Sequence, residues 1–562
     1  MNPVIRNPVL PGFHPDPSIV RVGEDYYLAN STFEWFPGVP IHHSRDLVNW
    51  RLIGHALTRP SQLDLRGIAD SAGVWAPSLS YADGKFWLIY TNIRQTGMGR
   101  PFKDCGIFLT TAENILGPWS DPVVLNNIGF DPSLFHDDDG RKWLLNMIWD
   151  YRQSGVVRFA GNVIQEYDPK SGKLIGPMTK ILQKQNVLCE GPNLYRRDGW
   201  YYLMMAEGGT GWTHSISMAR SRNILGPYEL DPQSVVLTSR DDVSLPLQKA
   251  GHGELVETPA GEWYLAHLAS RPLITGAPLN TGSPDKSDIA AQHAGHRCLL
   301  GRETCLQKVE WRDGWLRLAT GGTKPQLEVP APIGTPASGT ARSEPSSQLA
   351  VPEAGVPTRD DFDSEILDAR WSSLRVPMDE SWCSLTARPG WLRLRGRDSQ
   401  HSLYYQSLVA RRLQHFRVTV ETRLEFSPEL FTHSAGLICY YDTRTHFYLR
   451  VTHHESLGKV LGITLTDDAV YAELTDSQIS INDWQKVFLR AEIDHANLQF
   501  SASPDGVTWR NIGPVLDASK LSDDYGSALH FTGALVGLCC QDLKDNVLAA
   551  DFDCFDYRPA NG

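Results

Sequence analysis

The stretch GFHPDPSIV, residues 12–20, contains the pattern on which the fold of this chain depends. It places Asp16 between Pro15 and Pro17, immediately before a short apolar run. Both prolines fix their own φ and push the residues before them towards extended geometry, so Asp16 is expected at the stiff start of a β-strand. Taken alone, the stretch also fits a turn aspartate before an ordinary strand.

The same pattern returns four more times, at a spacing of about sixty residues, which is typical of repeat architectures. It recurs as WAPSL (75–79), DPSLF (131–135), EGPNL (190–194) and GHGEL (251–255). Four of the five strand starts carry an ionisable residue at or near the first position. This recurrence favours a repeated structural unit with a shared site over five unrelated turns.

An aromatic run follows each strand start, usually after Asp-Gly, as in DGKFWL (83–88), DGRKWL (139–144) and DGWYYL (198–203). Asp-Gly before such a run is a strong hairpin signal, because glycine accepts the positive φ of a tight turn. Units of roughly four short strands without long helical periodicity predict a five-bladed β-propeller over residues 1–320. The first strands of the blades line the axis of a propeller, so Asp16, Asp131, Glu190 and His252 are expected to meet there.

The composition changes after the fifth unit. Residues 321–358 are rich in Pro, Gly, Ser, Ala and Thr and are predicted to form a linker. Residues 359–562 again alternate as β-strands do, with strands expected at 416–424, 436–441, 447–451, 487–493 and 533–538. This half is predicted to be a β-sandwich of jelly-roll or lectin-like type, and the long segment 275–297 is predicted to be a local insertion.

Composition excludes several classes of protein. A chain of 562 residues is too long for one core. Its net charge of −12 and the lack of a Lys/Arg-rich tract argue against nucleic acid, and no apolar run predicts a membrane span. Residues 1–12 lack the pattern of a signal peptide, and the nine scattered cysteines suggest neither a disulfide framework nor a zinc site. A cytoplasmic location with reduced thiols is therefore expected.

Three carboxylates at one axis cost free energy, because like charges repel in a partly dry cavity. The cluster therefore suggests either a metal site or acid/base chemistry. Ligand-dense loops of the Asp-x-Asp-x-Asp kind are absent from the sequence, so no metal ligands are assigned. Cleavage of a glycosidic bond needs two carboxyl groups in different environments, and Asp16 and Glu190 suit these two roles. Asp131 would raise the proton affinity of a neighbouring acid and fix its direction.

The propeller half resembles glycoside hydrolase family 43, most closely its two-domain β-xylosidases. The resemblance rests on the segments already quoted together with STFEWFPG (31–38), VWAP (74–77), FDPS (130–133) and LGRET (300–304). In the second half, Asp361-Phe362 and LDARW (367–371) also resemble that subfamily's sandwich. The resemblance covers nearly the whole chain.

The resemblance implies a role for each candidate residue. Asp16 is the general base that activates water, Glu190 is the general acid, and Asp131 tunes and orients Glu190. Arg302 contacts sugar hydroxyls. His252 is also predicted to bind substrate, with the alternative that it only positions Asp131 or the sugar. The apolar walls of the pocket and the residue that closes it from the sandwich are aromatic: Phe33, Trp75, Trp149 and, for closure, Phe531. No cofactor is required, although some relatives hold a divalent cation beside such a histidine, which leaves room for one near His252.

Each binding residue also has a purely structural interpretation. Arg302 fits a structural ion pair, and Trp75 and Trp149 fit the packing between blades. Phe531 fits the ordinary interior of a sandwich strand. These alternatives stay open at the level of sequence.

The sequence therefore predicts an exo-acting, inverting xylan 1,4-β-xylosidase that removes terminal xylose from the non-reducing end of xylo-oligosaccharides and forms a homo-oligomer, either a dimer or a tetramer. The nearest alternative is an α-L-arabinofuranosidase, or an enzyme with both activities, because the two terminal sugars present similar hydroxyl patterns. An alternative from another class is a non-catalytic carbohydrate-binding propeller.

Overall fold

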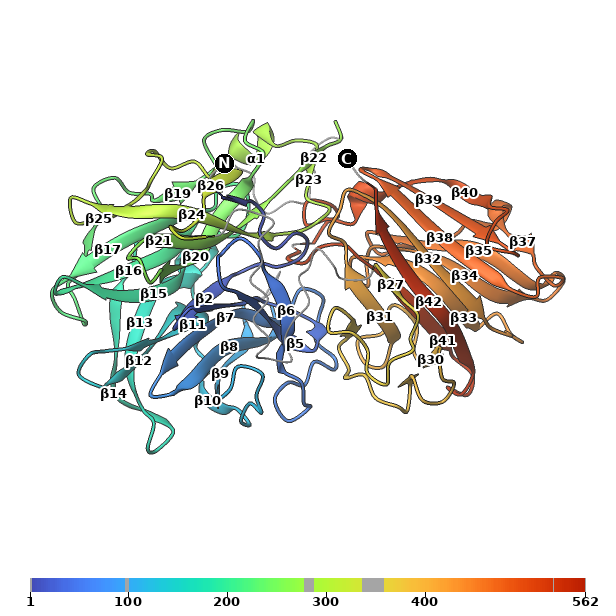
Figure 1. Ribbon diagram of the computed structural model, residues 1–562, viewed down its shortest axis with the longest axis horizontal. Helices are drawn as coiled ribbons and strands as arrows, with labels where there is room; N and C mark the ends of the chain where they lie inside the picture. Colours follow the sequence, from blue (N-terminus) through green and yellow to red (C-terminus); the bar gives the residue numbers. More distant parts are fainter. Residues whose placement is uncertain (1–2, 97–100, 277–287, 336–357, 529, 561–562) are drawn as a thin grey trace.

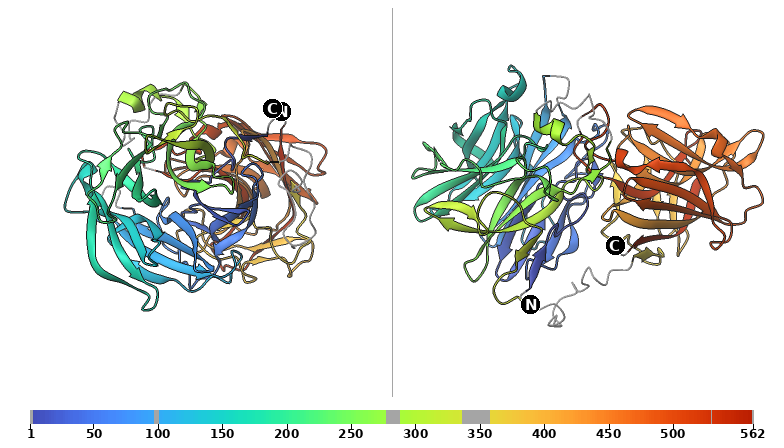
Figure 2. Two further views of the ribbon diagram at one scale, coloured as in Figure 1. Left: turned by 60° about the vertical axis from the view of Figure 1, so that its left-hand side comes forward. Right: turned by 90° about the horizontal axis from the view of Figure 1, so that it is seen from above.

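The computed structural model describes residues 3–96, 101–276, 288–335, 358–528 and 530–560. Within these ranges the chain is almost entirely β-structure and forms two domains side by side (Figure 1). The predicted five-bladed propeller followed by a β-sandwich is confirmed. The same two bodies are seen from two further directions in Figure 2.

The propeller is built from five antiparallel sheets that follow one another along the chain. Blade 1 holds β2 (Ser18–Val22), β3 (Asp25–Ala29), β5 (Gly38–Ser44) and β6 (Arg51–Leu57). Blade 2 holds β7 (Gly73–Ala82), β8 (Lys85–Gln95), β9 (Asp104–Ala112) and β10 (Val123–Asn126). Blade 3 holds β11 (Gly129–His136), β12 (Lys142–Trp149), β13 (Phe159–Asp168) and β14 (Lys173–Leu182), with the 3-10 turn η1 (Gly155–Arg158) before β13.

The last two blades complete the ring. Blade 4 holds β15 (Cys189–Arg197), β16 (Trp200–Glu207), β17 (Ser215–Ser221), β18 (Glu229–Leu230) and β19 (Leu237–Thr238). Blade 5 holds β20 (Gln248–Glu257), β21 (Trp263–Ser270), β24 (Glu303–Arg312) and β25 (Trp315–Leu318). The first strands β2, β7, β11, β15 and β20 contact one another in a closed ring, so their residues line the axis.

The N-terminal segment closes the propeller against blade 5. The side chain of Asn7 donates to the carbonyl of Leu306 and accepts from its amide, at 2.7 and 2.8 Å. Farther out, β1 (Val4–Arg6) pairs with β26 (Glu328–Pro330). The strand β26 thus lies inside the segment 321–358 that the sequence predicted as a linker, whereas residues 336–357 lie outside the described residues.

Segment 275–297 follows a short strand, β22 (Leu273–Ile274), which pairs with β23 (His296–Arg297). The helix α1 (Asp288–Gln292) lies between them, and residues 277–287 lie outside the described residues.

The sandwich consists of two large antiparallel sheets. One contains β27 (Arg359–Asp360), β29 (Cys383–Ser384), β30 (Leu392–Arg395), β32 (Arg417–Glu425), β38 (Val487–Asp494), β39 (Asn497–Ser503), β40 (Arg510–Asp517) and β42 (Ala549–Pro559). The other contains β28 (Ser372–Leu374), β31 (Ser407–Arg412), β33 (His433–Tyr440), β34 (His446–His454), β35 (Gly458–Asp467), β36 (Val470–Glu473), β37 (Ile479–Ser480) and β41 (Leu535–Asp542). Two 3-10 turns, η3 (Thr475–Ser477) and η4 (Ala518–Lys520), lie in the connections. The five strands expected from alternation correspond to β32, β33, β34, β38 and β41.

The two domains share one strand and one apolar core. The short strand β4 (Trp35–Phe36) leaves blade 1 and pairs with β28 at the edge of a sandwich sheet. Buried apolar residues of both domains form a single cluster around it, which includes Phe13, Trp35, Leu374 and Tyr440. Because a continuous apolar core excludes water from the whole contact, the domains are expected to be stable only together.

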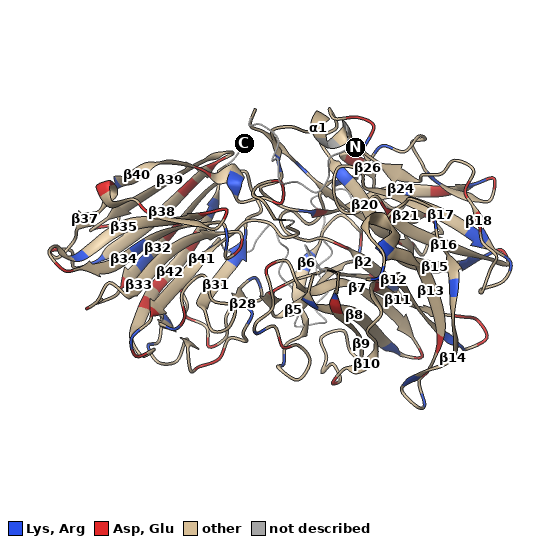
Figure 3. Cartoon of the chain, turned by 180° about the vertical axis from the view of Figure 1, so that it is seen from behind, with Lys and Arg blue, Asp and Glu red and all other residues tan. Residues whose placement is uncertain are grey.

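Charged residues of both signs are interspersed along the strands and loops of the two domains (Figure 3). The nine cysteines are all buried and unpaired. Among the described residues, no helix has the length and apolarity that a membrane span requires.

Candidate active site

The axis-lining strands start with one shared backbone feature. The equivalent positions of the five blades all have positive φ: Asp16 (52°), Ala76 (34°), Asp131 (52°), Gly191 (56°) and His252 (38°). In β7, β11, β15 and β20 the pairing register shifts at this point, as in a β-bulge. Positive φ costs a non-glycine residue about 1–3 kcal/mol, and bulges often re-aim side chains next to active sites. Four non-glycine residues in this conformation therefore mark the axis as a functional region.

Glu190 lies one residue before the shared position, which in blade 4 is taken by Gly191. Glu190 therefore leaves the strand from a different backbone position than Asp16 and Asp131. A Cβ atom at Gly191 would lie 3.0 Å from Nε2 of His252, so glycine suits both the φ and the space available. The offset gives Glu190 and Asp16 different surroundings.

Asp16 is buried and doubly held. Ser31 Oγ donates to its Oδ2 at 2.6 Å, and Arg302 Nη1 donates to its Oδ1 at 3.0 Å. His252 Nδ1 lies 3.6 Å from the same Oδ1. Burial pushes the pKa of Asp16 upward, but the charges of Arg302 and His252 and the Ser31 hydrogen bond outweigh it and hold the pKa below its ordinary value. Asp16 is thus ionised at neutral pH, as a general base must be.

The pKa values of Glu190 and Asp131 are raised, whereas that of Asp16 is lowered. Burial raises the pKa of Glu190 to about 7, and the charge of Asp16 adds to this effect, while Lys103 and Arg302 oppose it. Burial also raises the pKa of Asp131 to about 7, with contributions from Glu190 and Asp16 against the charge of His252. The site therefore places one ionised carboxylate beside two carboxyl groups whose pKa values are raised towards neutral pH, which is the separation that acid/base catalysis uses.

A small cavity continues along the axis beneath these groups. It is lined by Asp16, Asp131, His252 and Glu254 together with the proline segments of the blades, and it has room for about one water molecule. Glu254 accepts hydrogen bonds from Ser18 Oγ and the Ile19 amide at 2.7 and 3.0 Å, and from Ser78 Oγ at 3.1 Å. It therefore links blades 1, 2 and 5, and burial raises its pKa to about 7.

The structure brings three of the four predicted aromatic residues into one cluster. The ring of Phe531 stacks on Phe33 at 6.2 Å between centroids and meets Trp75 edge-on at 5.4 Å. Phe531 comes from the sandwich, whereas Phe33 and Trp75 come from blades 1 and 2. Trp149 joins this cluster through Phe130, whose ring centre lies 6.3 Å from that of Trp149 and 5.5 Å from that of Trp75. Both domains thus contribute to the aromatic lining.

Arg302 contacts residues of both domains. Besides Asp16, its Nη1 donates to Thr210 Oγ1 at 2.8 Å, and its Nη2 donates to the carbonyl of Phe531 at 2.8 Å. The arginine is almost fully buried. The structure therefore shows the ion pair that the sequence left open as an alternative, and a contact of Arg302 with sugar hydroxyls stays a prediction.

Two residues at the site lie outside every motif quoted from the sequence. Thr210 lies in the glycine-rich loop between β16 and β17. Lys103 places its Nζ 4.4 Å from the ring centre of Trp75, 4.6 Å from Phe130 and 4.7 Å from Trp149. Burial lowers the pKa of Lys103 to about 8, against the charges of Cys105, Glu190 and Asp131. Neither residue belongs to a repeated motif, so only spatial proximity reveals them.

A five-bladed propeller with an ionised carboxylate and two carboxyl groups of raised pKa at its axis fits the acid/base chemistry of a glycoside hydrolase. The chain belongs to glycosyl hydrolases family 43, which residues 5–316 match. Residues 359–558 match the beta xylosidase C-terminal concanavalin A-like domain. Sequence and site thus agree on the class of enzyme.

Several known proteins are similar over the full length. The crystal structure of xylan beta-1,4-xylosidase from Bacillus halodurans C-125 has 51% identity and a TM-score of 0.89, and the match covers 99% of this chain and 100% of that one. A xylosidase/arabinosidase of Humicola insolens is 45% identical over 99% of this chain and 98% of its own length. A xylan 1,3-beta-xylosidase of a Vibrio species is 44% identical over 99% of both chains.

Proposed function

We propose that this enzyme is an exo-acting, inverting β-xylosidase that removes terminal D-xylose from the non-reducing end of β-1,4-linked xylo-oligosaccharides. The observation that carries the proposal is the contrast between the lowered pKa of Asp16 and the raised pKa of Glu190 at one axis. The similarity to the B. halodurans 1,4-xylosidase supports the sugar and the linkage.

In the proposed reaction a water molecule lies between Asp16 and the anomeric carbon. Asp16 accepts a proton from this water as its oxygen attacks, and Glu190 gives its proton to the oxygen of the departing sugar. One bond forms and one breaks in the same displacement, so the configuration at the anomeric carbon inverts. Asp131 keeps Glu190 directed at the leaving oxygen, and Arg302 keeps Asp16 ionised.

The aromatic cluster supports the exo mode of action. Phe531 reaches from the sandwich to Phe33 and Trp75. With a sugar bound at the axis, its ring would exclude water from one side of the proposed pocket. Exclusion of water strengthens the hydrogen bonds and charges that act on the sugar. A pocket closed on one side accepts the end of a chain, whereas an open groove would accept its middle.

Chromogenic substrates test the sugar specificity. We expect faster release from an aryl β-D-xyloside than from an aryl α-L-arabinofuranoside. The similarity to the Humicola xylosidase/arabinosidase favours arabinofuranoside cleavage as a second activity. Preference for the arabinofuranoside would overturn the xylosidase assignment, and no release from either would revive a non-catalytic carbohydrate-binding propeller.

A second comparison tests the linkage. We expect 1,4-linked xylobiose to be cleaved faster than the 1,3-linked isomer. The similarity to the Vibrio 1,3-xylosidase makes this comparison necessary, because the identities to the two types of relative are close. Faster cleavage of the 1,3-linked isomer would reassign the natural substrate.

A divalent cation near His252 stays a prediction, and no residue is assigned to hold it. Among the described residues no three His, Cys, Asp or Glu side chains are grouped so that they would hold one. Asp16 is occupied by Ser31 and Arg302, and Glu254 by two serines and an amide. We therefore derive no step through a divalent cation at His252.

We also propose a cytoplasmic location, which the nine buried and unpaired cysteines support. Assembly into a homo-oligomer stays a prediction, and light scattering of the purified enzyme tests it.

A further inference from the structure

The loop between η4 and β41 carries Phe531 from the sandwich to the pocket. The backbone of Phe531 is held on both sides by the propeller: its amide donates to Ser71 Oγ at 3.0 Å, and its carbonyl accepts from Arg302 Nη2 at 2.8 Å. The ring position therefore depends on where this loop meets blades 1, 2 and 5.

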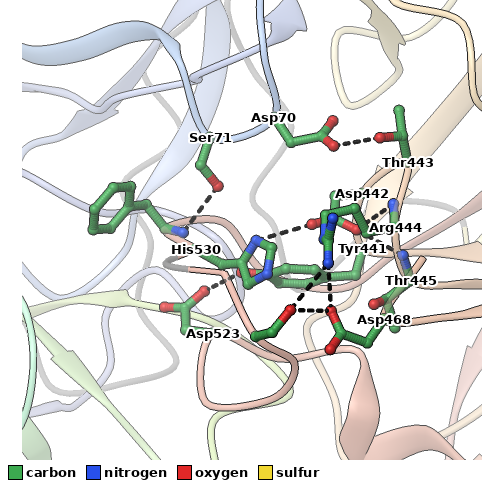
Figure 4. A network of polar contacts seen from close by, with 12 residues as sticks. Asp70, Ser71, Tyr441, Asp442, Thr443, Arg444, Thr445, Asp468, Asp523 and His530 are labelled. Atoms are coloured by element: carbon green, nitrogen blue, oxygen red, sulfur yellow. Dashed lines mark hydrogen bonds and ion pairs between the residues drawn. The ribbon is translucent and has the colours of Figure 1, made fainter. Parts of the chain in front are cut away.

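The residue before it, His530, is buried and faces the sandwich (Figure 4). Its Nδ1 lies 2.9 Å from Oδ2 of Asp442, and its ring meets Tyr441 edge-on at 5.4 Å. The other oxygen of Asp442 accepts from the amides of Arg444 and Thr445 at 2.8 and 2.7 Å. Asp442 is thus fixed by its own turn and offers His530 a carboxylate in a set position.

The turn that holds Asp442, residues 442–445, also contacts the propeller. Thr443 Oγ1 donates to Asp70, the neighbour of Ser71, and Arg375 donates to the other oxygen of Asp70 at 2.7 Å. The contacts form a closed path that runs from Ser71 to Phe531, His530, Asp442, Thr443, Asp70 and back to Ser71 (Figure 4). A closed path fixes the position of Phe531 relative to both domains.

The start of the loop is anchored separately. Tyr441 donates its hydroxyl to Asp523 at 2.6 Å, and Lys249 of β20 pairs with Asp524 at 2.6 Å. The charged groups that act most strongly on His530 are the carboxylates of Asp442, Asp523 and Asp70. Burial lowers the pKa of His530, but Asp442, Asp523 and Asp70 outweigh it and raise the pKa above its ordinary value. His530 thus keeps its positive charge longer than a free histidine as the pH rises.

We propose that His530 is a positioning residue for the reaction: its contact with Asp442 sets the place of the Phe531 ring against Phe33 and Trp75. This inference rests on the proposed function, because it takes Phe531 as the residue that closes the pocket. A buried ion pair adds little stability over apolar packing of the same volume, so the benefit of this pair lies in fixed geometry.

The test compares His530→Ala, His530→Asn, Phe531→Ala and the double variant His530→Ala/Phe531→Ala in the full-length enzyme on xylobiose. We expect His530→Ala to lower kcat/KM about tenfold, since a small misplacement of a binding group has effects of this order or larger. The division between kcat and KM should match that of Phe531→Ala. The double variant should equal Phe531→Ala, because a misplaced ring and a missing ring lose the same contact.

His530→Asn is the rescue variant, because an asparagine amide nitrogen can take the place of Nδ1 and contact Asp442. It should recover kcat/KM to within about twofold of the wild type, inside the usual error of additivity. The matched control is His433→Ala. His433 Nε2 lies 3.4 Å from Asp542, and this pair is also buried, but it lies at the other end of β33, about 25–30 Å from Asp442. It should lower the melting temperature and leave kcat/KM unchanged.

Independent losses from His530→Ala and Phe531→Ala that multiply in the double variant would overturn the inference. An equal loss of kcat/KM in His433→Ala would do the same, because it would show an effect of stability alone. If His530→Ala does not fold, Thr443→Val takes its place, because it removes the hydrogen bond to Asp70 that belongs to the same closed path. Thr443→Val is then measured both with Phe531 present and together with Phe531→Ala. A wild-type enzyme that releases nothing from an aryl xyloside would instead overturn the proposed function, and the inference with it.

Discussion

The substitution Arg302→Met removes the positive charge that keeps Asp16, the proposed base, ionised. The guanidinium lies 3.0 Å from the Asp16 carboxylate, and both side chains are buried, so bulk water screens their interaction little. An opposite charge at this range lowers a carboxyl pKa by about one to three units. Without the charge of Arg302, His252, Ser31 and His214 still lower the pKa of Asp16 and counter the rise that burial causes. The pKa of Asp16 should therefore rise by about one to three units, or about 1.4–4 kcal/mol.

The assay is the pH dependence of kcat/KM on an aryl xyloside with a good leaving group, for which the acid contributes little. Asp16 must be ionised to act, so activity is lost as the pH falls through its pKa. In the wild type this loss should lie below the ordinary range of an aspartate, because the pKa is lowered. In Arg302→Met the acidic limb should move upward by about one to three pH units.

Arg302→Met also removes donors to Thr210 and Phe531, so kcat/KM should fall at every pH. Only the position of the limb reports on Asp16. Arg317→Met is the matched control, since Arg317 forms a comparable ion pair with buried Asp231, away from the axis cavity. It should leave the limb unmoved. An acidic limb in Arg302→Met that coincides with that of the wild type would refute the electrostatic role of Arg302.

Three further predictions concern the acid and the domain contact. The alkaline limb of kcat/KM should lie near pH 7, because Glu190 and Asp131 have pKa values raised to about 7 and the acid must hold its proton; a limb below about pH 5.5 would contradict this. Glu190→Ala should damage substrates with poor leaving groups far more than activated aryl glycosides, whereas Asp16→Ala should damage both alike; equal sensitivity in kinetic assays would reverse the assignment. A chain that ends near residue 335 should be insoluble or nearly inactive, because it exposes the apolar cluster that both domains share; a soluble and fully active fragment would contradict the joint pocket.

The axis could be predicted because its signals are local and repeated. Proline beside the strand start, Asp-Gly turns and aromatic runs recur in each blade, and the propeller geometry then places Asp16, Asp131 and His252 together. The one-residue offset of Glu190 was not predicted, although a signal existed. Aligning Pro192 with Pro17 and Pro132 puts Gly191, not Glu190, at the shared position with positive φ.

The contacts between the domains could not be predicted in the same way. Arg375 of the sandwich and Asp70 of the propeller pair across 305 residues of sequence. The strand β4 is only two residues long and pairs with β28 in the other domain, so alternation gives no sign of it. Contacts of this kind depend on how the propeller and the sandwich pack against each other, and local sequence propensities do not encode that packing.

The central claim is a single displacement in which Asp16 activates water and Glu190 protonates the leaving group. Proton NMR of the first sugar released from an aryl β-D-xyloside, recorded before mutarotation, tests it most directly. The account predicts that α-xylose appears first. If β-xylose appears first, the reaction is a double displacement, and Asp16 would have to be a nucleophile instead of a base.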